Sequence, residues 1–210
     1  MRARIFLADD HTLLLDAFKT LLEPEYEIVG TATDGRMMLK MVAKLAPDLV
    51  LMDIAMPNLN GFDAGEKLKK ILPDVKLVFL TVNEDPDMVT EAFRIGANGY
   101  LLKSSAASEL FQAIETVMNS KSYVSPKLEE SMADAQIKHP GTPKVHGELS
   151  IRQREVLQLL AEGHTMKQVA AILNITPRTV AFHKYQIMET LDVKSNSELI
   201  QYAVKHGFVI

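Results

Sequence analysis

Polar or charged residues follow four short apolar runs in the first half of the 210-residue sequence, at points where strands would end. Asp9 and Asp10 follow the first run, Asp53 the second, Thr81 the third and Lys103 the fourth. The carboxyl ends of strands in an open parallel sheet meet at one edge, so these side chains are expected to converge. Clustered carboxylates repel one another unless a cation is present, and hard oxygen ligands suit Mg²⁺. The pattern therefore predicts a magnesium site with a carboxylate nucleophile beside it.

The chemistry expected here is transfer of a phosphoryl group to a carboxylate. Asp53 is the best-placed nucleophile, because it lies between the other polar positions and a loop rich in turn formers, residues 54–61, follows it. Its attack would give an acyl phosphate, while the metal and the Lys103 ammonium neutralise the developing charge and Thr81 hydrogen-bonds a phosphoryl oxygen. Taken singly, such residues are more often caps, turn formers or surface charges, so the prediction depends on the whole set.

Strand and helix patterns alternate through this half of the chain. The predicted strands are Arg4–Ala8, Glu27–Ala32, Asp48–Asp53, Lys76–Thr81 and Gly99–Lys103, and the predicted helices are Thr12–Leu22, Gly35–Leu45, Gly61–Ile71, Pro86–Ile95 and Ala106–Asn119. Three strands are nearly continuous apolar runs, as strands buried on both faces of a parallel sheet require. We predict an α/β fold with a doubly wound five-stranded parallel sheet in the flavodoxin-like order 2-1-3-4-5.

Residues 3–120 resemble the receiver domain of two-component response regulators. The segments that carry the resemblance are 9–11, 48–57 with 60–61, 80–81 and 96–103. It implies that a sensor histidine kinase supplies the phosphoryl group to Asp53, and that Thr81 and Tyr100 form a switch pair whose aromatic ring moves inward. The implied Mg²⁺ ligands are the side chains of Asp10 and Asp53, the Asp9 side chain through water, and the backbone carbonyl of Ala55.

Composition limits the other classes of protein. Hydrophobic residues make up 47% of the chain, which is ample for packed cores, and the absence of cysteine excludes disulfides and thiolate metal sites. The early apolar run 5–8 is far too short for a signal peptide or a membrane span, so we expect a cytoplasmic protein. Residues 1–120 carry 12 Lys and Arg against 18 Asp and Glu, whereas residues 146–210 carry 7 against 6.

A change in composition after Asn119 marks a linker. Serine, proline and glycine interrupt the periodicity over residues 121–146, and apolar residues become sparse until Leu149. The pair Ser125-Pro126 resembles a helix start, so a short helix to about Ile137 is predicted, followed by a flexible stretch over residues 139–147.

The remaining residues, 147–210, show four short helical patterns and predict a small all-α four-helix domain. The segments Met166–Leu173 and Pro177–Leu191 are joined by three residues, with Thr176 as the expected N-cap and proline at the first helical position. This arrangement is typical of a helix-turn-helix, although many helical bundles contain similar pairs.

Specific residues strengthen the DNA-binding interpretation, because the domain resembles the LuxR-type output domain. The matching segments are 149–157, 161–163, 170–173 and 179–187, and the two domains together resemble the NarL/FixJ group of response regulators. The resemblance implies that the second helix enters the major groove of double-stranded DNA. The predicted DNA contacts are Thr176, Arg178, Thr179, Ala181, Phe182, Lys184 and Tyr185. Many relatives have lysine or arginine at positions 181 and 185, so base recognition is expected to depend on Phe182 and Tyr185, with Lys184 on phosphate.

Two other functions remain open. A phosphatase of the haloacid dehalogenase type also uses a strand-end aspartate, but it requires a second aspartate two residues later, where this chain has Ala55. We therefore do not expect a conventional enzyme beyond slow self-dephosphorylation. The second alternative is a DNA-binding or protein-interaction module whose receiver no longer responds to phosphorylation. The favoured interpretation is a phosphorylation-controlled transcription regulator that acts as a homodimer on phosphorylation or DNA binding.

Overall fold

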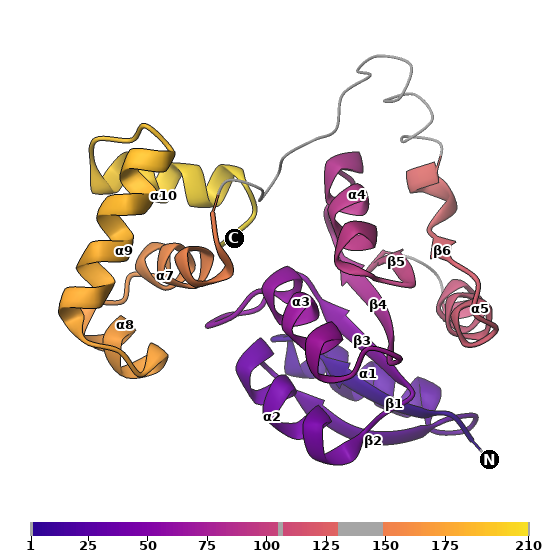
Figure 1. Ribbon diagram of the computed structural model, residues 1–210. Coiled ribbons are helices and arrows are strands. Elements are labelled where there is room, and N and C mark those ends of the chain that lie inside the picture. The colour runs from indigo at the N-terminus through magenta and orange to yellow at the C-terminus, as the bar shows by residue number, and fades with distance from the viewer. Residues whose placement is uncertain (1, 105–106, 130–148, 210) are drawn as a thin grey trace.

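The computed structural model describes residues 2–104, 107–129 and 149–209, which form two domains (Figure 1). The strands of the first domain are β1 (Arg4–Ala8), β2 (Glu27–Ala32), β3 (Leu49–Asp53), β4 (Lys76–Thr81), β5 (Gly99–Leu102) and β6 (Tyr123–Val124). Its helices are α1 (Thr12–Leu22), α2 (Gly35–Leu45), α3 (Gly61–Ile71), α4 (Pro86–Ile95) and α5 (Ala107–Met118). The predicted strand and helix bounds agree with these to within one residue.

The sheet is parallel and its strand order is β2-β1-β3-β4-β5-β6. The doubly wound α/β fold is confirmed, but the prediction of five strands is wrong, because β6 adds a sixth at the edge. Tyr123 and Val124 pair with Gly99 and Tyr100 of β5. The next residue, Ser125, extends this pairing, since its hydroxyl accepts a hydrogen bond from the Leu102 amide at 3.1 Å. Sheet structure therefore continues past residue 121, where the linker was predicted to begin.

Alternation along the strands divides the core into two layers, one on each face of the sheet. On β1, Phe6 packs in the layer formed with α2, α3 and α4, whereas Ile5 and Leu7 pack in the layer formed with α1 and α5. This is the period-two pattern of a strand that is buried on both faces. Because helices cover both faces, only the strand ends are left to carry polar chemistry.

The described residues that follow β6, 126–129, pack on the first domain. Residues 126–129 are helical, which agrees with the predicted helix start, and Leu128 is fully buried in the same core layer as Tyr100. The rest of the predicted helix and the predicted flexible stretch lie outside the described residues.

The second domain is a bundle of α7 (Ile151–Ala161), α8 (Met166–Leu173), α9 (Pro177–Thr190) and α10 (Asn196–Lys205). The predicted four-helix pattern is confirmed. Each helix has a Ser or Thr N-cap whose side chain accepts a backbone N–H from the first turn, as helix starts favour. Val156, Val180, Ile187 and Leu199 are among the residues that form its core. Within the described part of the chain, no helix has both the length and the apolar character that a membrane crossing needs.

Candidate functional site: an acidic centre and a helix-turn-helix

Three of the predicted site residues meet at the carboxyl edge of the sheet. Asp9 follows β1, Asp53 ends β3 and Lys103 follows β5, and all three converge because β1, β3, β4 and β5 are neighbouring parallel strands. The Lys103 Nζ atom lies 2.8 Å from an oxygen of Asp9 and 2.8 Å from an oxygen of Asp53. Both aspartates are buried, and Asp53 is only 2% exposed. One ammonium group therefore bridges two carboxylates from separate strands.

Asp10 completes the acidic group together with a residue that the sequence did not single out. His11 Nδ1 lies 2.8 Å from an Asp10 oxygen, and the His11 backbone N–H donates to Asp9 at 2.9 Å. One ligand atom from each of Asp9, Asp10, His11 and Asp53 falls within 4.8 Å of the others. His11 lies in the segment 9–11 that resembles receiver domains, but no role was predicted for it.

The electrostatics of Asp53 and Lys103 reflect their burial. Burial raises the pKa of Asp53, with Asp9 adding to the effect, and this outweighs the hydrogen bond and the charge of Lys103. For Lys103, burial alone would lower the pKa, but hydrogen bonds and charge from Asp53 and Asp9 reverse the effect and raise it. Lys103 therefore stays charged. Burial disfavours the ionised form of Asp53, and an additional positive charge nearby would stabilise that form.

The donor set fits a magnesium ion. Asp9, Asp10 and Asp53 supply carboxylate oxygens from the ends of two adjacent strands, and hard oxygen ligands of this kind are what Mg²⁺ prefers. The cluster carries more carboxylates than cationic partners, so a divalent cation would offset the excess charge.

The other predicted receiver residues lie on the loop after β3, at the end of β4 and on β5. The Ala55 N–H donates to an Asp53 oxygen at 3.3 Å, so the loop after β3 is bonded to the carboxylate itself. Thr81 ends β4, next to β3, and its hydroxyl accepts the Asn83 N–H at 3.0 Å. Tyr100 is fully buried on β5, and burial raises the pKa of its hydroxyl. The ring already lies inside the core in this conformation.

The predicted DNA-contact residues lie at the N-cap of α9 and between Arg178 and Tyr185 of that helix, and they differ in exposure. Thr176 is the N-cap, and its hydroxyl accepts the Thr179 N–H at 3.1 Å. The side chains of Phe182 and Tyr185 are 58% and 69% exposed although both are large and aromatic. Arg178 is also exposed, whereas Ala181 and Lys184 are partly buried. Exposed aromatics beside a basic residue on the second helix of this motif suit base and phosphate contact.

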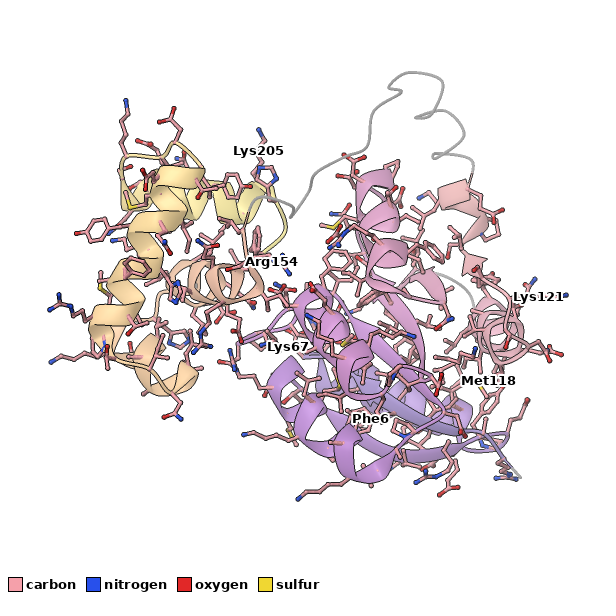
Figure 2. The ribbon with its side chains drawn as sticks, in the orientation of Figure 1. Phe6, Lys67, Met118, Lys121, Arg154 and Lys205 are labelled. Atoms are coloured by element: carbon pink, nitrogen blue, oxygen red, sulfur yellow. The ribbon has the colours of Figure 1, made fainter. Side chains whose placement is uncertain are left out.

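A contact between the domains was not predicted. Arg154 on α7 and Lys67 on α3 lie where the two domains meet (Figure 2), and each pairs with a carboxylate of the other domain. No pattern in the sequence indicates this contact, since charged residues on amphipathic helices usually face water.

Comparison with known protein families agrees with the two-domain geometry. The family model of the response regulator receiver domain matches residues 5–115, and that of the bacterial regulatory proteins of the luxR family matches residues 147–203. The chain is 32% identical to the transcriptional regulatory protein DegU of Brevibacillus brevis, over 99% of this chain and 95% of DegU. It is 34% identical to the oxygen regulatory protein NreC of Staphylococcus carnosus, over 96% of this chain and 97% of NreC.

Solved structures show the same architecture. A LuxR-family two-component response regulator from Aurantimonas sp. is 29% identical, with a TM-score of 0.63 over 65% of this chain and 99% of that one. The RcsB response regulator of Salmonella typhimurium has a TM-score of 0.66 over 98% of both chains, and at 24% identity it supports the fold alone. The receiver and luxR-family matches, the full-length relatives and the acidic centre at the sheet edge together place the chain in the NarL/FixJ group of two-component response regulators.

Proposed function

We propose that this protein controls transcription through phosphorylation of Asp53 by a sensor histidine kinase, acting in the cytoplasm on double-stranded DNA. The observation that carries the proposal is the position of Lys103, whose ammonium lies 2.8 Å from both Asp53 and Asp9. A cation held against a strand-end carboxylate stabilises the additional negative charge that a phosphoryl group brings.

In the proposed reaction, an Asp53 carboxylate oxygen attacks phosphorus and forms a new P–O bond. The bond between phosphorus and the donor breaks, and its electron pair leaves with the donor imidazole or, with acetyl phosphate, with acetate. Lys103 neutralises charge on the phosphoryl oxygens, and the Thr81 hydroxyl turns from the Asn83 N–H to donate to one of them. Mg²⁺, held by Asp9, Asp10, Asp53 and the Ala55 carbonyl, supplies further positive charge when bound. Tyr100 acts with Thr81 as the switch pair.

We expect Asp10→Asn to weaken Mg²⁺ binding by about tenfold or more, because the variant loses one charged oxygen ligand. Calorimetry is the suitable measurement, since the chain contains no tryptophan to report binding by fluorescence. Asp16→Asn is the matched control, because Asp16 is exposed on α1 outside the acidic group. Equal affinities for the wild type and the Asp10 variant would contradict the metal assignment.

The second part of the proposal is that the exposed residues of α9 bind DNA. We propose that α9 lies in the major groove, with Thr176, Arg178, Thr179, Ala181, Phe182, Lys184 and Tyr185 at the interface. A domain with few basic residues makes few phosphate contacts, so one copy binds weakly and two copies on adjacent half-sites bind well. Homodimeric binding is therefore part of the proposal. The relative DegU is a transcriptional regulatory protein, which supports this role.

Two substitutions on α9 separate phosphate contact from base recognition. Lys184→Ala should weaken binding to specific and scrambled duplexes alike and lower the salt slope by about one phosphate contact. Phe182→Ala should mainly relax base preference, because an apolar contact with a thymine methyl depends on sequence. Binding isotherms at several salt concentrations measure both effects. An unchanged salt slope for Lys184→Ala, or undiminished preference for Phe182→Ala, would contradict the assigned contacts.

A beryllofluoride titration followed by NMR tests the proposal against the alternative of a receiver that no longer responds. Beryllofluoride with Mg²⁺ mimics the phosphoryl group without the need for the cognate kinase. A responsive receiver should show shifts at Asp53, Thr81 and Lys103 and tighter binding to two adjacent half-sites. A receiver that binds no beryllofluoride, or binds it without any change in DNA affinity, would support the alternative.

A further inference from the structure

The exposed side of α9 carries two large aromatic side chains. Arg178, Phe182, Tyr185 and Glu189 follow one another at intervals of four, three and four residues, which places them within about 60° of one another around the helix axis. All four are exposed, and we call them the α9 stripe. The side chains of Phe182 and Tyr185 are 58% and 69% exposed. Exposed aromatic side chains that lie together are typical of a surface that another molecule covers.

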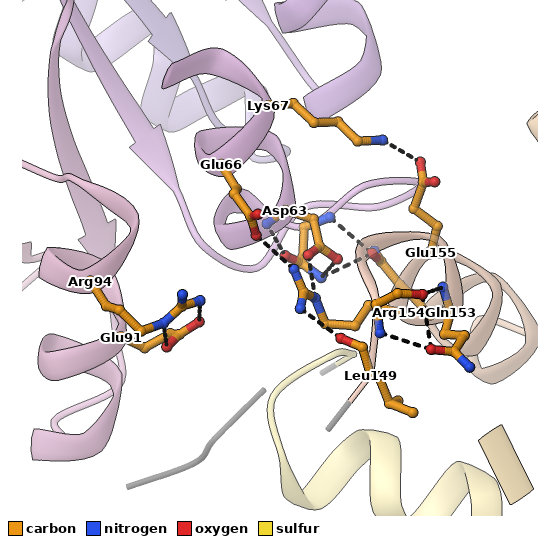
Figure 3. Close-up of polar contacts among 12 residues, drawn as sticks. Asp63, Glu66, Lys67, Glu91, Arg94, Leu149, Gln153, Arg154 and Glu155 are labelled. Carbon is orange, nitrogen blue, oxygen red and sulfur yellow. Dashed lines mark hydrogen bonds and ion pairs between the residues drawn. The ribbon is translucent and has the colours of Figure 1, made fainter. Parts of the chain in front are cut away.

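The receiver domain does not cover the α9 stripe. The polar contacts in Figure 3 that join the two domains come from α7, whose Arg154 and Glu155 pair with side chains of α3. Phe182 and Tyr185 keep their exposure while these contacts are made. The stripe is therefore open to a molecule outside this chain.

The distribution of charge along the stripe favours DNA as that molecule, in agreement with the proposed function, on which this inference rests. The stripe begins at Arg178 in the first turn of α9, where the helix dipole adds positive potential, and it ends at Glu189 in the last turn. Phosphate attracts an arginine and repels a carboxylate, so the first turns of α9 enter the major groove and Glu189 stays outside. Phe182 and Tyr185 lie between these two ends and face the base edges.

The chemistry of the two aromatic side chains restricts which base edges they can meet. In the major groove, the C5-methyl group of thymine is the only apolar group that a base pair presents. The Phe182 ring has no hydrogen-bond donor, so against the O6 and N7 acceptors of guanine it would leave buried polar atoms without partners. The Tyr185 ring can contact a methyl group while its hydroxyl donates to the O4 atom of the same thymine. Both side chains therefore suit A·T pairs.

We propose that the α9 stripe recognises two adjacent A·T base pairs through the C5-methyl groups of their thymines. Three residues advance by about 4.5 Å along a helix axis, which is close to the spacing of about 3.4 Å between base pairs, so Phe182 and Tyr185 meet neighbouring pairs. Each half-site of this protein thus carries thymine at two adjacent positions. Cytosine is disfavoured at both positions because it lacks the methyl group.

The test uses the full chain with beryllofluoride and Mg²⁺ and begins with selection of binding sites from a library of random duplexes. The selected half-site should contain two adjacent A·T pairs. Deoxyuridine then replaces single thymidines of one half-site, which removes the methyl group and keeps every hydrogen-bonding group of the base. Binding isotherms should show a loss of about fourfold in affinity at each of the two positions, and of roughly fifteenfold when both are replaced.

Three variants assign each methyl group to one side chain. Phe182→Ala should bind the thymidine and deoxyuridine duplexes equally at one position and keep the fourfold preference at the neighbouring position, and Tyr185→Ala should show the reverse. Tyr185→Phe keeps the ring and should keep the preference for the methyl group. Ile71→Ala removes an exposed apolar side chain from α3 and is the matched control, which should resemble the wild type at both positions. Since all three residues are exposed, we expect every variant to fold.

A comparison of two cytosine bases separates the methyl group from the rest of thymine. At either position, 5-methylcytidine should bind the wild type about fourfold more tightly than cytidine, because it carries a methyl group on the same ring carbon. The variant that lacks the corresponding aromatic ring should bind both duplexes equally.

The possible outcomes distinguish the proposed function from this inference. If the full chain selects no sequence, the proposed function fails and this inference fails with it. If the chain selects a half-site without adjacent A·T pairs, or tolerates deoxyuridine at every position, it binds DNA through other contacts and only this inference fails. Alanine variants that keep every preference for the methyl group would also overturn it. A lower mass of these variants in light scattering would then assign the two aromatic side chains to a contact between copies of the chain.

Discussion

Asp53→Asn should abolish phosphorylation by acetyl phosphate, with a rate at least about a hundredfold below that of the wild type. The amide has nearly the same shape as the carboxylate, but its lone pairs are delocalised and it carries no negative charge, so it is a poor nucleophile towards phosphorus. Intact-mass spectrometry measures the gain of one phosphoryl group per chain. Asp74→Asn is the matched control, because Asp74 is an exposed carboxylate in the loop before β4.

Gain of a phosphoryl mass by the Asp53 variant at the wild-type rate would show that another residue is the acceptor.

The Asp53→Asn variant should also keep its fold, and the direction in which its stability changes can be predicted. Burial raises the pKa of Asp53 above its unfolded value, so its contribution to stability is present at low pH and lost as the pH rises through the folded pKa.

At neutral pH, the metal-free Asp53→Asn variant should therefore unfold at a higher temperature than the wild type. The difference should shrink as the pH falls, because Asp53 takes up a proton first in the folded state and, at pH values below about 4, in the unfolded state as well. Mg²⁺ should stabilise the wild type and have little effect on the variant, because only the wild type retains the full set of charged ligands. Calorimetric melts across pH, with and without Mg²⁺, measure both effects.

The acidic centre could be predicted from sequence because its geometry follows from the topology. Asp9, Asp53 and Lys103 each come directly after a buried apolar strand, and a parallel sheet places such positions at one edge whatever the packing details. The orientation of His11 towards Asp10 could not be read in this way, since it depends on the backbone turn between β1 and α1. The roles assigned to these residues in phosphoryl transfer and metal binding stay predictions.

The sixth strand could not be predicted from the alternation of apolar and polar residues in the sequence. β6 contains only Tyr123 and Val124, within a segment whose serines and prolines indicate a linker. It forms because the neighbouring edge of β5 offers unpaired backbone groups and because Ser125 bonds to Leu102 and Tyr100. A pairing of two residues depends on tertiary context and has no pattern of its own.

The contact between α7 and the receiver could not be predicted, for a different reason. Arg154, Glu155 and Gln158 lie on the polar side of an amphipathic helix, and in a domain considered alone that side faces water. Only the complementary charges of α2 and α3 make their burial possible, and those residues are about ninety or more positions away along the chain. Sequence patterns within one domain therefore describe each partner correctly and still miss their contact.

Gly61→Ala should be the most damaging small substitution in the receiver. A Cβ at Gly61 would lie 2.3 Å from the Asp53 carbonyl oxygen and 2.7 Å from the Ile54 Cα. Both are backbone atoms, and the Gly61 N–H is already bonded to the Ile54 carbonyl at 2.8 Å, so neither segment can move away alone. The backbone conformation is not the cause, because Gly61 is not among the described residues with positive φ. The requirement is for close approach of the α3 start to the end of β3.

Replacing glycine by alanine in a helix normally stabilises a protein slightly, so the sign of the effect is itself a test. We expect Gly61→Ala to cost about 3 kcal/mol and to lower the receiver unfolding temperature by roughly 10 °C. Gly65→Ala, on the same helix, is the control, because its added Cβ meets side chains, those of Phe79, Leu77 and Met52, whereas at Gly61 it meets backbone atoms. Below its unfolding temperature, the Gly61 variant should bind beryllofluoride more weakly than the wild type, because the added side chain displaces the end of β3, which carries Asp53. Calorimetry and the NMR titration measure the two effects, and equal melting of the two alanine variants would show that the contact at Asp53 tolerates a side chain.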